Sequence, residues 1–170
     1  KFFLTVEEIQ AIREGYIYIH DMSARRDTMN CCLFDVKNVL SGGFEMGNLW
    51  YNEPKTLDTA FDVIGDIVLS AASQQYGGFT VPSVDEILEP YAEKSHKKLI
   101  EKYRALGLDE EVVQKIAWSD LEKEMEQGFQ GWEYKFNSVS SSRGDYPFIT
   151  VTAEHGQVFM ENWQRSRCWK

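Results

Sequence analysis

Three segments of the chain repeat apolar residues every three or four positions, which is the spacing of helices that bury one face. One such helix is expected to begin at Pro54 and run to about Tyr76, and another to follow Ser83 and end near Gly107. The longest should start after Asp109, with its apolar stripe at Val113, Ala117, Leu121, Met125, Phe129, Trp132 and Phe136. These stripes predict a mainly helical core.

Shorter elements are expected near the N-terminus. Thr5 and Glu8 have the spacing of a capping box, so a short helix should follow Thr5 and stop at Gly15. The next residues, 16–19, are rich in tyrosine and isoleucine and therefore favour a β-strand.

Two glycine-rich segments, 41–48 and 76–80, separate the expected helices. They are expected to be loops, which either punctuate the helices or let the backbone approach a ligand closely. Before the first loop, residues 32–40 have helical spacing and predict another helix. A strand is expected within 146–152, after a polar hinge. The whole pattern indicates a helix-rich α/β fold.

The composition of the chain excludes some classes of binding partner. With 170 residues, of which 43% are hydrophobic, the chain is long enough for one domain with a sizeable core. The net charge is -9, so there is no chain-wide basic field for polymeric nucleic acid, although a few local donors could still hold a nucleotide. No run approaches the roughly 18 apolar residues of a membrane helix, and no signal peptide is visible. We therefore expect a cytoplasmic protein without a membrane partner.

Two of the three cysteines, Cys31 and Cys32, are adjacent. An odd count and a strained vicinal bridge make a disulfide framework a poor interpretation, so reduced thiols are expected. Buried packing explains such a pair, but a thiol at the start of the predicted helix 32–40 would have a lowered pKa and could be reactive. His20, Cys31 and Cys32 lack metal-ligand spacing, so no metal site is expected.

A series of short segments together resembles one family, the anaerobic (class III, glycyl-radical) ribonucleoside-triphosphate reductases. The resemblance extends over roughly residues 6–152. The segments, in family order, are Tyr18-Ile19-His20-Asp21, Asn30-Cys31-Cys32-Leu33, Gly43-Phe44-Glu45-Met46-Gly47-Asn48, Pro54-Lys55-Thr56, Ala72-Ser73-Gln74-Gln75-Tyr76-Gly77-Gly78, Glu133-Tyr134-Lys135-Phe136-Asn137 and Ser141-Ser142-Arg143-Gly144-Asp145-Tyr146-Pro147-Phe148.

The resemblance implies a ten-stranded α/β barrel of the ribonucleotide reductase and glycyl-radical enzyme type, with the active site inside it. Residues 1–152 would form the N-terminal portion of this catalytic barrel, as a partial barrel with early strands and flanking helices. Residues 153–170 depart from the family pattern and are expected to form an atypical C-terminal tail.

The implied reaction converts ribonucleoside triphosphates to deoxyribonucleotides. In the family, a radical-SAM activase generates a glycyl radical. That radical forms a cysteine thiyl radical, which takes hydrogen from the 3' carbon of the ribose. The 2' hydroxyl then leaves as water, and a reductant, often formate, completes the reduction. We expect the thiyl-forming cysteine, the glycyl-radical loop and a structural zinc site in later segments, so this segment itself should hold no cofactor and be inactive alone.

The resemblance also implies roles for particular residues. Cys31 matches the second active-site thiol, which donates hydrogen to the 2' position, and Asn30 would bind the sugar beside it. His20 and Ser142 are expected to contact the substrate as well. Cys32 should pack inward, because successive side chains point in different directions.

Lys55 and Gln74 fall in the regions that in the family form the dimer interface and bind effector nucleotides. They are therefore expected to bind deoxynucleoside triphosphates or ATP in a homodimer. Another interpretation of the same sequence is a catalytically inactive helical fragment that acts as an oligomerising or effector-binding module. A redox or metal-binding module built on the two adjacent cysteines is a third, which the spacing of the cysteines and histidines does not favour.

Overall fold

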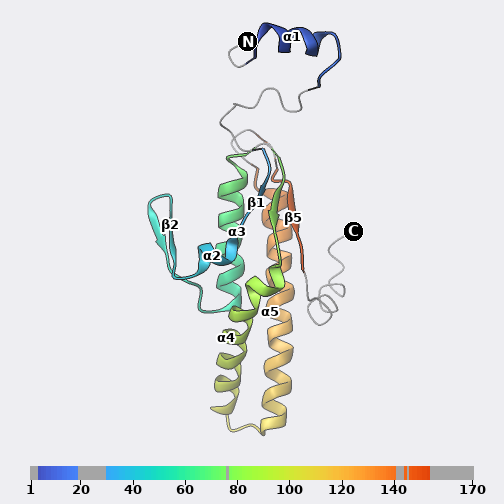
Figure 1. Ribbon diagram of the computed structural model, residues 1–170. Coiled ribbons are helices and arrows are strands. Elements are labelled where there is room, and N and C mark those ends of the chain that lie inside the picture. Colours follow the sequence, from blue (N-terminus) through green and yellow to red (C-terminus); the bar gives the residue numbers. More distant parts are fainter. Residues whose placement is uncertain (1–3, 19–29, 76, 141–143, 145, 154–170) are drawn as a thin grey trace.

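The structure is a computed structural model that describes residues 4–18, 30–75, 77–140, 144 and 146–153. Its elements, in chain order, are α1 (Val6–Arg13), β1 (Cys32–Leu33), α2 (Val36–Leu40), β2 (Phe44–Met46), β3 (Leu49–Tyr51), α3 (Leu57–Ala72), β4 (Phe79–Val81), α4 (Val84–Arg104), α5 (Glu110–Ser138) and β5 (Ile149–Val151) (Figure 1). Most of the described residues are helical, which confirms the helix-rich α/β class. The strands of this part form no closed barrel.

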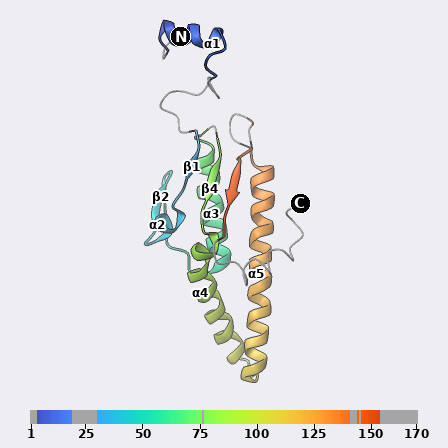
Figure 2. The same cartoon turned by 45° about the vertical axis from the view of Figure 1, so that its right-hand side comes forward.

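A three-stranded parallel sheet runs along α3 and α5, with β4 between β1 and β5 (Figure 2). Cys32 pairs with Phe79, and Phe79 pairs with Ile149, so segments from three distant parts of the sequence come together. A separate antiparallel hairpin is formed by β2 and β3. Parallel pairing requires long crossover connections, and here α3, α4 and α5 lie within them.

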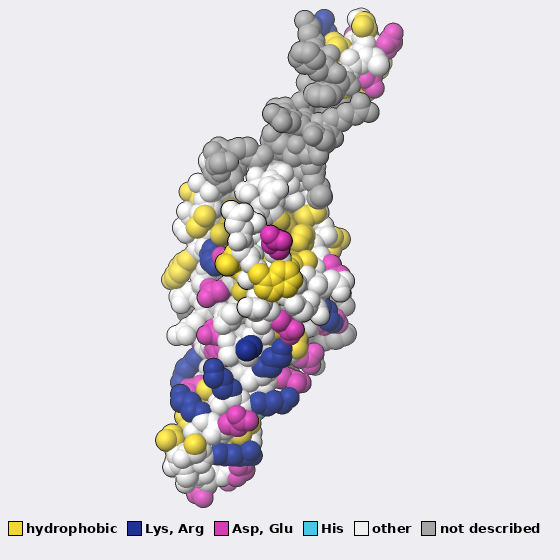
Figure 3. All heavy atoms as spheres, turned by 90° about the vertical axis from the view of Figure 1, so that its left-hand side faces the viewer, with side chains coloured by type: hydrophobic (Ala, Val, Ile, Leu, Met, Phe, Trp, Pro, Cys, Tyr) yellow, Lys and Arg dark blue, Asp and Glu magenta, His cyan; other side chains and the backbone are white. Residues whose placement is uncertain are grey.

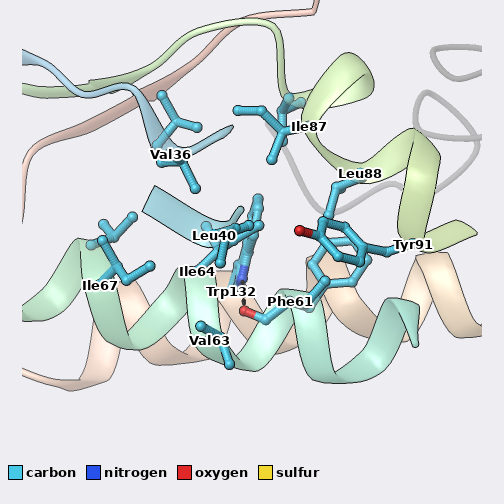
Figure 4. Close-up of a cluster of buried hydrophobic side chains, with 14 of the residues drawn as sticks. Val36, Leu40, Phe61, Val63, Ile64, Ile67, Ile87, Leu88, Tyr91 and Trp132 are labelled. Carbon is cyan, nitrogen blue, oxygen red and sulfur yellow. Dashed lines mark hydrogen bonds between the residues drawn. The ribbon is translucent and has the colours of Figure 1, made fainter. Parts of the chain in front are cut away.

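The core lies between the sheet and helices α2, α3, α4 and α5 (Figure 4). Phe61 on α3 is packed edge to face against Trp132 and Phe129 of α5, with ring centroids 4.8 and 5.0 Å away. The Trp132 indole Nε1 donates a 2.7 Å hydrogen bond to the Phe61 carbonyl oxygen. This bond satisfies a polar group that burial would otherwise leave without a partner, so aromatic packing and hydrogen bonding both join α3 to α5.

The start of α3 is capped by side chains from other helices. Thr56 is the N-cap residue but makes no side-chain capping bond. Instead, the buried Ser95 Oγ on α4 accepts a 2.8 Å hydrogen bond from the Leu57 amide, and Glu124 Oε1 on α5 accepts one of 2.9 Å from the Asp58 amide. Ser95 Oγ also donates to Glu124 Oε1 at 3.0 Å. The expected start at Pro54 is therefore too early, because the helix begins where α4 and α5 supply acceptors for its free amides.

Several predicted elements are confirmed. The capping box between Thr5 and Glu8 is formed in both directions, and α1 ends before Gly15, whose φ is +81°. The predicted stripe of α5 is buried except for Met125, which is partly buried against the core. The long α4 begins after Ser83 as expected, although Ser83 makes no side-chain capping bond.

Other predictions are wrong. Residues 16–18 form no strand and are exposed. The segment 32–40 starts as strand β1 and becomes helical only at Val36, because Cys32 and Leu33 pair with β4. The expected loop 41–48 contains β2 and the turn that leads into β3, and the aromatic rings of Phe44 and Tyr51 stack across this hairpin.

Helices α4 and α5 continue beyond the sheet as a helical arm (Figure 1). Positively and negatively charged side chains are interspersed over the arm on the face shown in Figure 3. Ion pairs within it include Arg104 with Glu110 at 2.5 Å and Lys123 with Asp120 at 3.2 Å. None of the described helices combines the length and apolar character needed to cross a membrane.

Alanine substitutions at the two glycines of α5 should change the free energy of unfolding in opposite directions. A Cβ at Gly128 would overlap the Phe61 ring, whereas a Cβ at Gly131 meets nothing within 4 Å. Gly128→Ala should therefore lower the free energy of unfolding by about 1–3 kcal/mol through overpacking. Gly131→Ala should raise it by about 0.5–1 kcal/mol through better helix propensity. Urea denaturation followed by circular dichroism measures both, and equal effects of the two variants would contradict the packing of α3 on α5.

Candidate active site

The starts of the three parallel strands meet at one edge of the sheet. Asn30 and Cys31 precede β1, Gly77 and Gly78 precede β4, and Phe148 precedes β5. The Cys32 amide donates to the Gly78 carbonyl at 3.0 Å, and the Phe79 amide donates to the Phe148 carbonyl at 2.8 Å. We call this edge the strand-start edge. It gathers residues of three predicted motifs that are far apart in the sequence.

Residues of the sheet alternate between two faces. Cys32, Phe79 and Ile149 form one row across the strands, and all three belong to the core packed against the helices. The next row, Leu33, Thr80 and Thr150, faces the opposite way, and Leu33 is 74% exposed. Cys31, one residue before Cys32, is exposed. The two adjacent thiols therefore differ in surroundings, and the expectation that Cys32 packs inward is confirmed.

Gly77 provides the contact surface for Cys31 and Asn30. A Cβ at position 77 would collide with Cys31 Sγ, and it would lie 2.6 Å from the Asn30 carbonyl oxygen and 2.7 Å from Asn30 Oδ1. The Gly77 amide donates a 2.5 Å hydrogen bond to the Asn30 carbonyl. Only glycine fits so close an approach, which gives a physical role to one glycine of the expected loop 76–80.

Gln75 connects the inward-facing thiol to the same two glycines. Its side chain is only 5% exposed, and its Oε1 accepts a 3.1 Å hydrogen bond from Cys32 Sγ. Its Nε2 donates to the carbonyl oxygens of Gly78 at 3.0 Å and Gly77 at 3.3 Å. Burial raises the pKa of the Cys32 thiol, and the hydrogen bond with Gln75 opposes this shift only in part.

The structure does not place Cys31 at a helix start. Strand β1 follows it directly, and α2 begins only at Val36 with Asp35 as its N-cap. The interpretation of Cys31 as a thiol activated by a helix dipole is therefore wrong, because the dipole effect is confined to the first turn of a helix. What distinguishes Cys31 is its exposure and its contact with Gly77.

Four predicted site residues remain: His20, Ser142, Lys55 and Gln74. His20 and Ser142 are outside the described residues. Lys55 and Gln74 are both exposed, but they flank opposite ends of α3, a 16-residue helix that is about 24 Å long at 1.5 Å per residue. One chain therefore does not bring these two residues together.

Gln75 was not among the predicted site residues. Neighbouring glutamines at positions 74 and 75 follow the end of α3 at Ala72, so helical periodicity gives no basis for deciding which of them turns inward. Within the part of the chain that the structure describes, no three histidine, cysteine or acidic side chains come together as metal ligands.

Comparison with known proteins adds independent findings. The family model described as "Anaerobic ribonucleoside-triphosphate reductase" matches residues 1–166. The protein of that name from Enterobacteria phage T4 is 35% identical over 155 residues, which is 90% of this chain and 25% of the relative. That from Escherichia coli (strain K12) is 34% identical over 169 residues, which is 94% of this chain and 23% of the relative. The chain thus spans about a quarter of the length of these curated relatives.

The two adjacent thiols should differ in reactivity. Alkylation requires the thiolate, and Cys32 is partly buried with a raised pKa, so at pH 8 iodoacetamide should label Cys31 first. Labelling of Cys32 should accelerate only as the pH rises toward that raised pKa. Time-resolved peptide mass spectrometry separates the cysteines, with Cys31→Ser as the control that removes the fast site. Equal rates, or faster labelling of Cys32, would contradict this arrangement.

Proposed function

Because the chain belongs to the anaerobic ribonucleoside-triphosphate reductase family, we propose that it supplies one side of the active site of such a reductase. The observation that carries the proposal is the exposed Cys31 thiol packed against Gly77, with Asn30 beside it, where three parallel strands start. This arrangement places an exposed thiol and an exposed side-chain amide next to the same glycine at the strand-start edge.

Cys31 is proposed to be the thiol that donates hydrogen to the 2' carbon of the ribose. In the net reaction hydrogen replaces the 2' hydroxyl, the hydroxyl leaves as water, and a reductant such as formate supplies two electrons and is itself oxidised. A glycyl radical made by a radical-SAM activase would supply the one-electron chemistry from another part of the enzyme. The task of this chain is then to hold an S–H group toward the sugar.

Asn30 is proposed to bind the sugar next to Cys31. Its backbone carbonyl is held by the Gly77 amide at 2.5 Å, and its side chain is exposed. A side-chain amide offers both donors and an acceptor, which suits the vicinal hydroxyls of a ribose. His20 and Ser142 are proposed as further substrate contacts on the basis of their matches to the family segments.

The three-stranded parallel sheet is proposed to be part of the catalytic barrel, formed by residues 1–152. Helices α3 and α5 cover one face, as helices cover the outside of an α/β barrel. The other face carries Leu33, Thr80 and Thr150, and Cys31 directly precedes β1 at the strand-start edge. That face would line the barrel interior. Residues 153–170 are proposed to form an atypical C-terminal tail.

Effector nucleotides, deoxynucleoside triphosphates or ATP, are proposed to bind near α3 in a homodimer. Lys55 can pair with a phosphate group, and Gln74 offers an amide. Since α3 separates them by about 24 Å within one chain, they could share one nucleotide only if they come from different subunits. Otherwise each would contribute to a separate contact.

Activity should depend on Cys31 far more than on Cys32. In the complete reductase that contains this chain, Cys31→Ser should lower deoxyribonucleotide formation by more than about 1,000-fold. Serine keeps the size and polarity, but an O–H bond holds its hydrogen atom much more tightly than an S–H bond does. Cys32→Ala, the neighbouring replacement, should cost about tenfold or less, because that thiol points into the core. Retained activity in Cys31→Ser would overturn the proposed function.

Effector binding should depend on Lys55. Calorimetric titration of the chain with deoxynucleoside triphosphates and ATP, with the oligomeric state measured by light scattering, should show saturable binding by a dimer. Lys55→Ala should weaken it by about tenfold or more through loss of a charge-assisted bond. Lys115→Ala removes another exposed lysine, on α5, and serves as the matched control. Equal affinities of the two variants would contradict the role of Lys55.

A further inference from the structure

We propose that Gln75 and Cys32 are positioning residues that hold the Gly77–Gly78 turn in place and thereby fix the direction of the Cys31 thiol. The inference rests on the proposed function of Cys31. Neither residue is proposed to touch the substrate. Both act through Gly77, against which Asn30 and Cys31 lie, and through Gly78, whose carbonyl accepts a hydrogen bond from the Cys32 amide. We call the set Cys32, Gln75, Gly77 and Gly78 the glutamine brace.

The first step of the argument is the burial of the Gln75 amide. At 5% exposure, each polar atom of this side chain needs a partner within the protein. The Cys32 thiol satisfies Oε1, and the carbonyl oxygens of Gly77 and Gly78 satisfy Nε2. These bonds restrict the amide to one orientation, so Gln75 holds two consecutive carbonyls at fixed positions relative to Cys32.

The second step is that the same two glycines hold the backbone on both sides of Cys31. The Gly77 amide donates to the Asn30 carbonyl at 2.5 Å, and the Gly78 carbonyl accepts from the Cys32 amide at 3.0 Å. Hydrogen bonds therefore connect Cys32 Sγ to Gln75, and Gln75 to Gly77 and Gly78. Further hydrogen bonds connect these two glycines to Asn30 and Cys32, the residues on either side of Cys31. A displacement of the Gly77–Gly78 turn would move both flanking bonds at once.

The third step is the tight contact at Gly77. Cys31 Sγ lies against the Cα of Gly77, where no Cβ could be accommodated, so any shift of this glycine changes the space available to the thiol. A hydrogen donor must point at the accepting carbon to within a small error, and a displacement of about 1 Å costs on the order of 100-fold in rate. Gln75 therefore controls a catalytic distance without being part of the catalytic contact.

Gln75→Met tests the brace, since methionine has the same chain length but lacks both amide bonds. In the complete reductase, kcat should fall about 10- to 100-fold while KM for the nucleotide changes by less than about threefold. Iodoacetamide should label Cys31 faster than in the wild type, because the contact with Gly77 loosens. Gln130→Met replaces an exposed glutamine of α5, whose Nε2 bonds only to Tyr134 in the described hydrogen bonds, and should change neither quantity.

A second pair of variants leaves Gln75 in place. Cys32→Val removes the thiol donor to Gln75 Oε1 at similar volume, and Cys32→Ser restores a donor at the same position. Valine should lower kcat by about fivefold, the equivalent of one neutral hydrogen bond, and serine should return it toward the wild-type value. If Cys32 had a purely structural role, Cys32→Val would lower the melting temperature but leave kcat and the labelling of Cys31 unchanged.

The outcomes separate this inference from the proposed function. Labelling of Cys31 reports on its surroundings whether or not the enzyme turns over, so the brace is tested even where Cys31→Ser keeps activity and the proposed function fails. If folded Gln75→Met labels Cys31 at the wild-type rate with wild-type kcat, the inference is overturned while the role of Cys31 stands. The inference is supported if Gln75→Met labels Cys31 faster and has a lower kcat. Cys32→Val should then show the same two changes, and Cys32→Ser should reverse them.

Discussion

The close approach of Gly77 to Asn30 and Cys31 is the constraint from which the arrangement of the site follows. It brings two chain segments separated by more than 40 residues into contact, and the parallel pairing of β1 with β4 begins immediately beyond it. Because β4 also pairs with β5, the same contact determines where the third strand starts. The starts of the strands, and with them the exposed thiol, are therefore gathered by one backbone contact that only glycine permits.

The helices could be predicted from the sequence to a far greater degree than the strands. The stripe of α5 recurs over many turns, so the burial of Phe129, Trp132 and Phe136 follows from periodicity alone. Strands of two or three residues contain too little alternation to be recognised, and β1 therefore looked like the first turn of a helix. The start of α3 was misplaced for another reason: its cap comes from Ser95 and Glu124, which local sequence does not reveal.

The candidate site could be predicted from motifs but not in its geometry. Family segments selected Asn30 and Cys31, and the alternation of side chains correctly assigned Cys32 to the core. Gln75 could not be predicted because its role depends on the backbone that follows α3. Lys55 and Gln74 are both expected to bind the effector, but they lie beyond opposite ends of α3. The order of motifs along the sequence does not reveal how far apart they lie in space. Here the distance follows from α3, because a helix rises 1.5 Å per residue.

Geometry, more than charge, distinguishes the two thiols. Cys32 packs against the core and its thiol donates to the neutral amide of Gln75, and Cys31 lies against Gly77, which is also neutral. A nucleophilic cysteine benefits from nearby positive charge, which favours its thiolate. A thiol that delivers a hydrogen atom must instead remain protonated and point in a fixed direction. The proposed glutamine brace meets the second requirement by fixing the glycine against which the Cys31 sulfur rests.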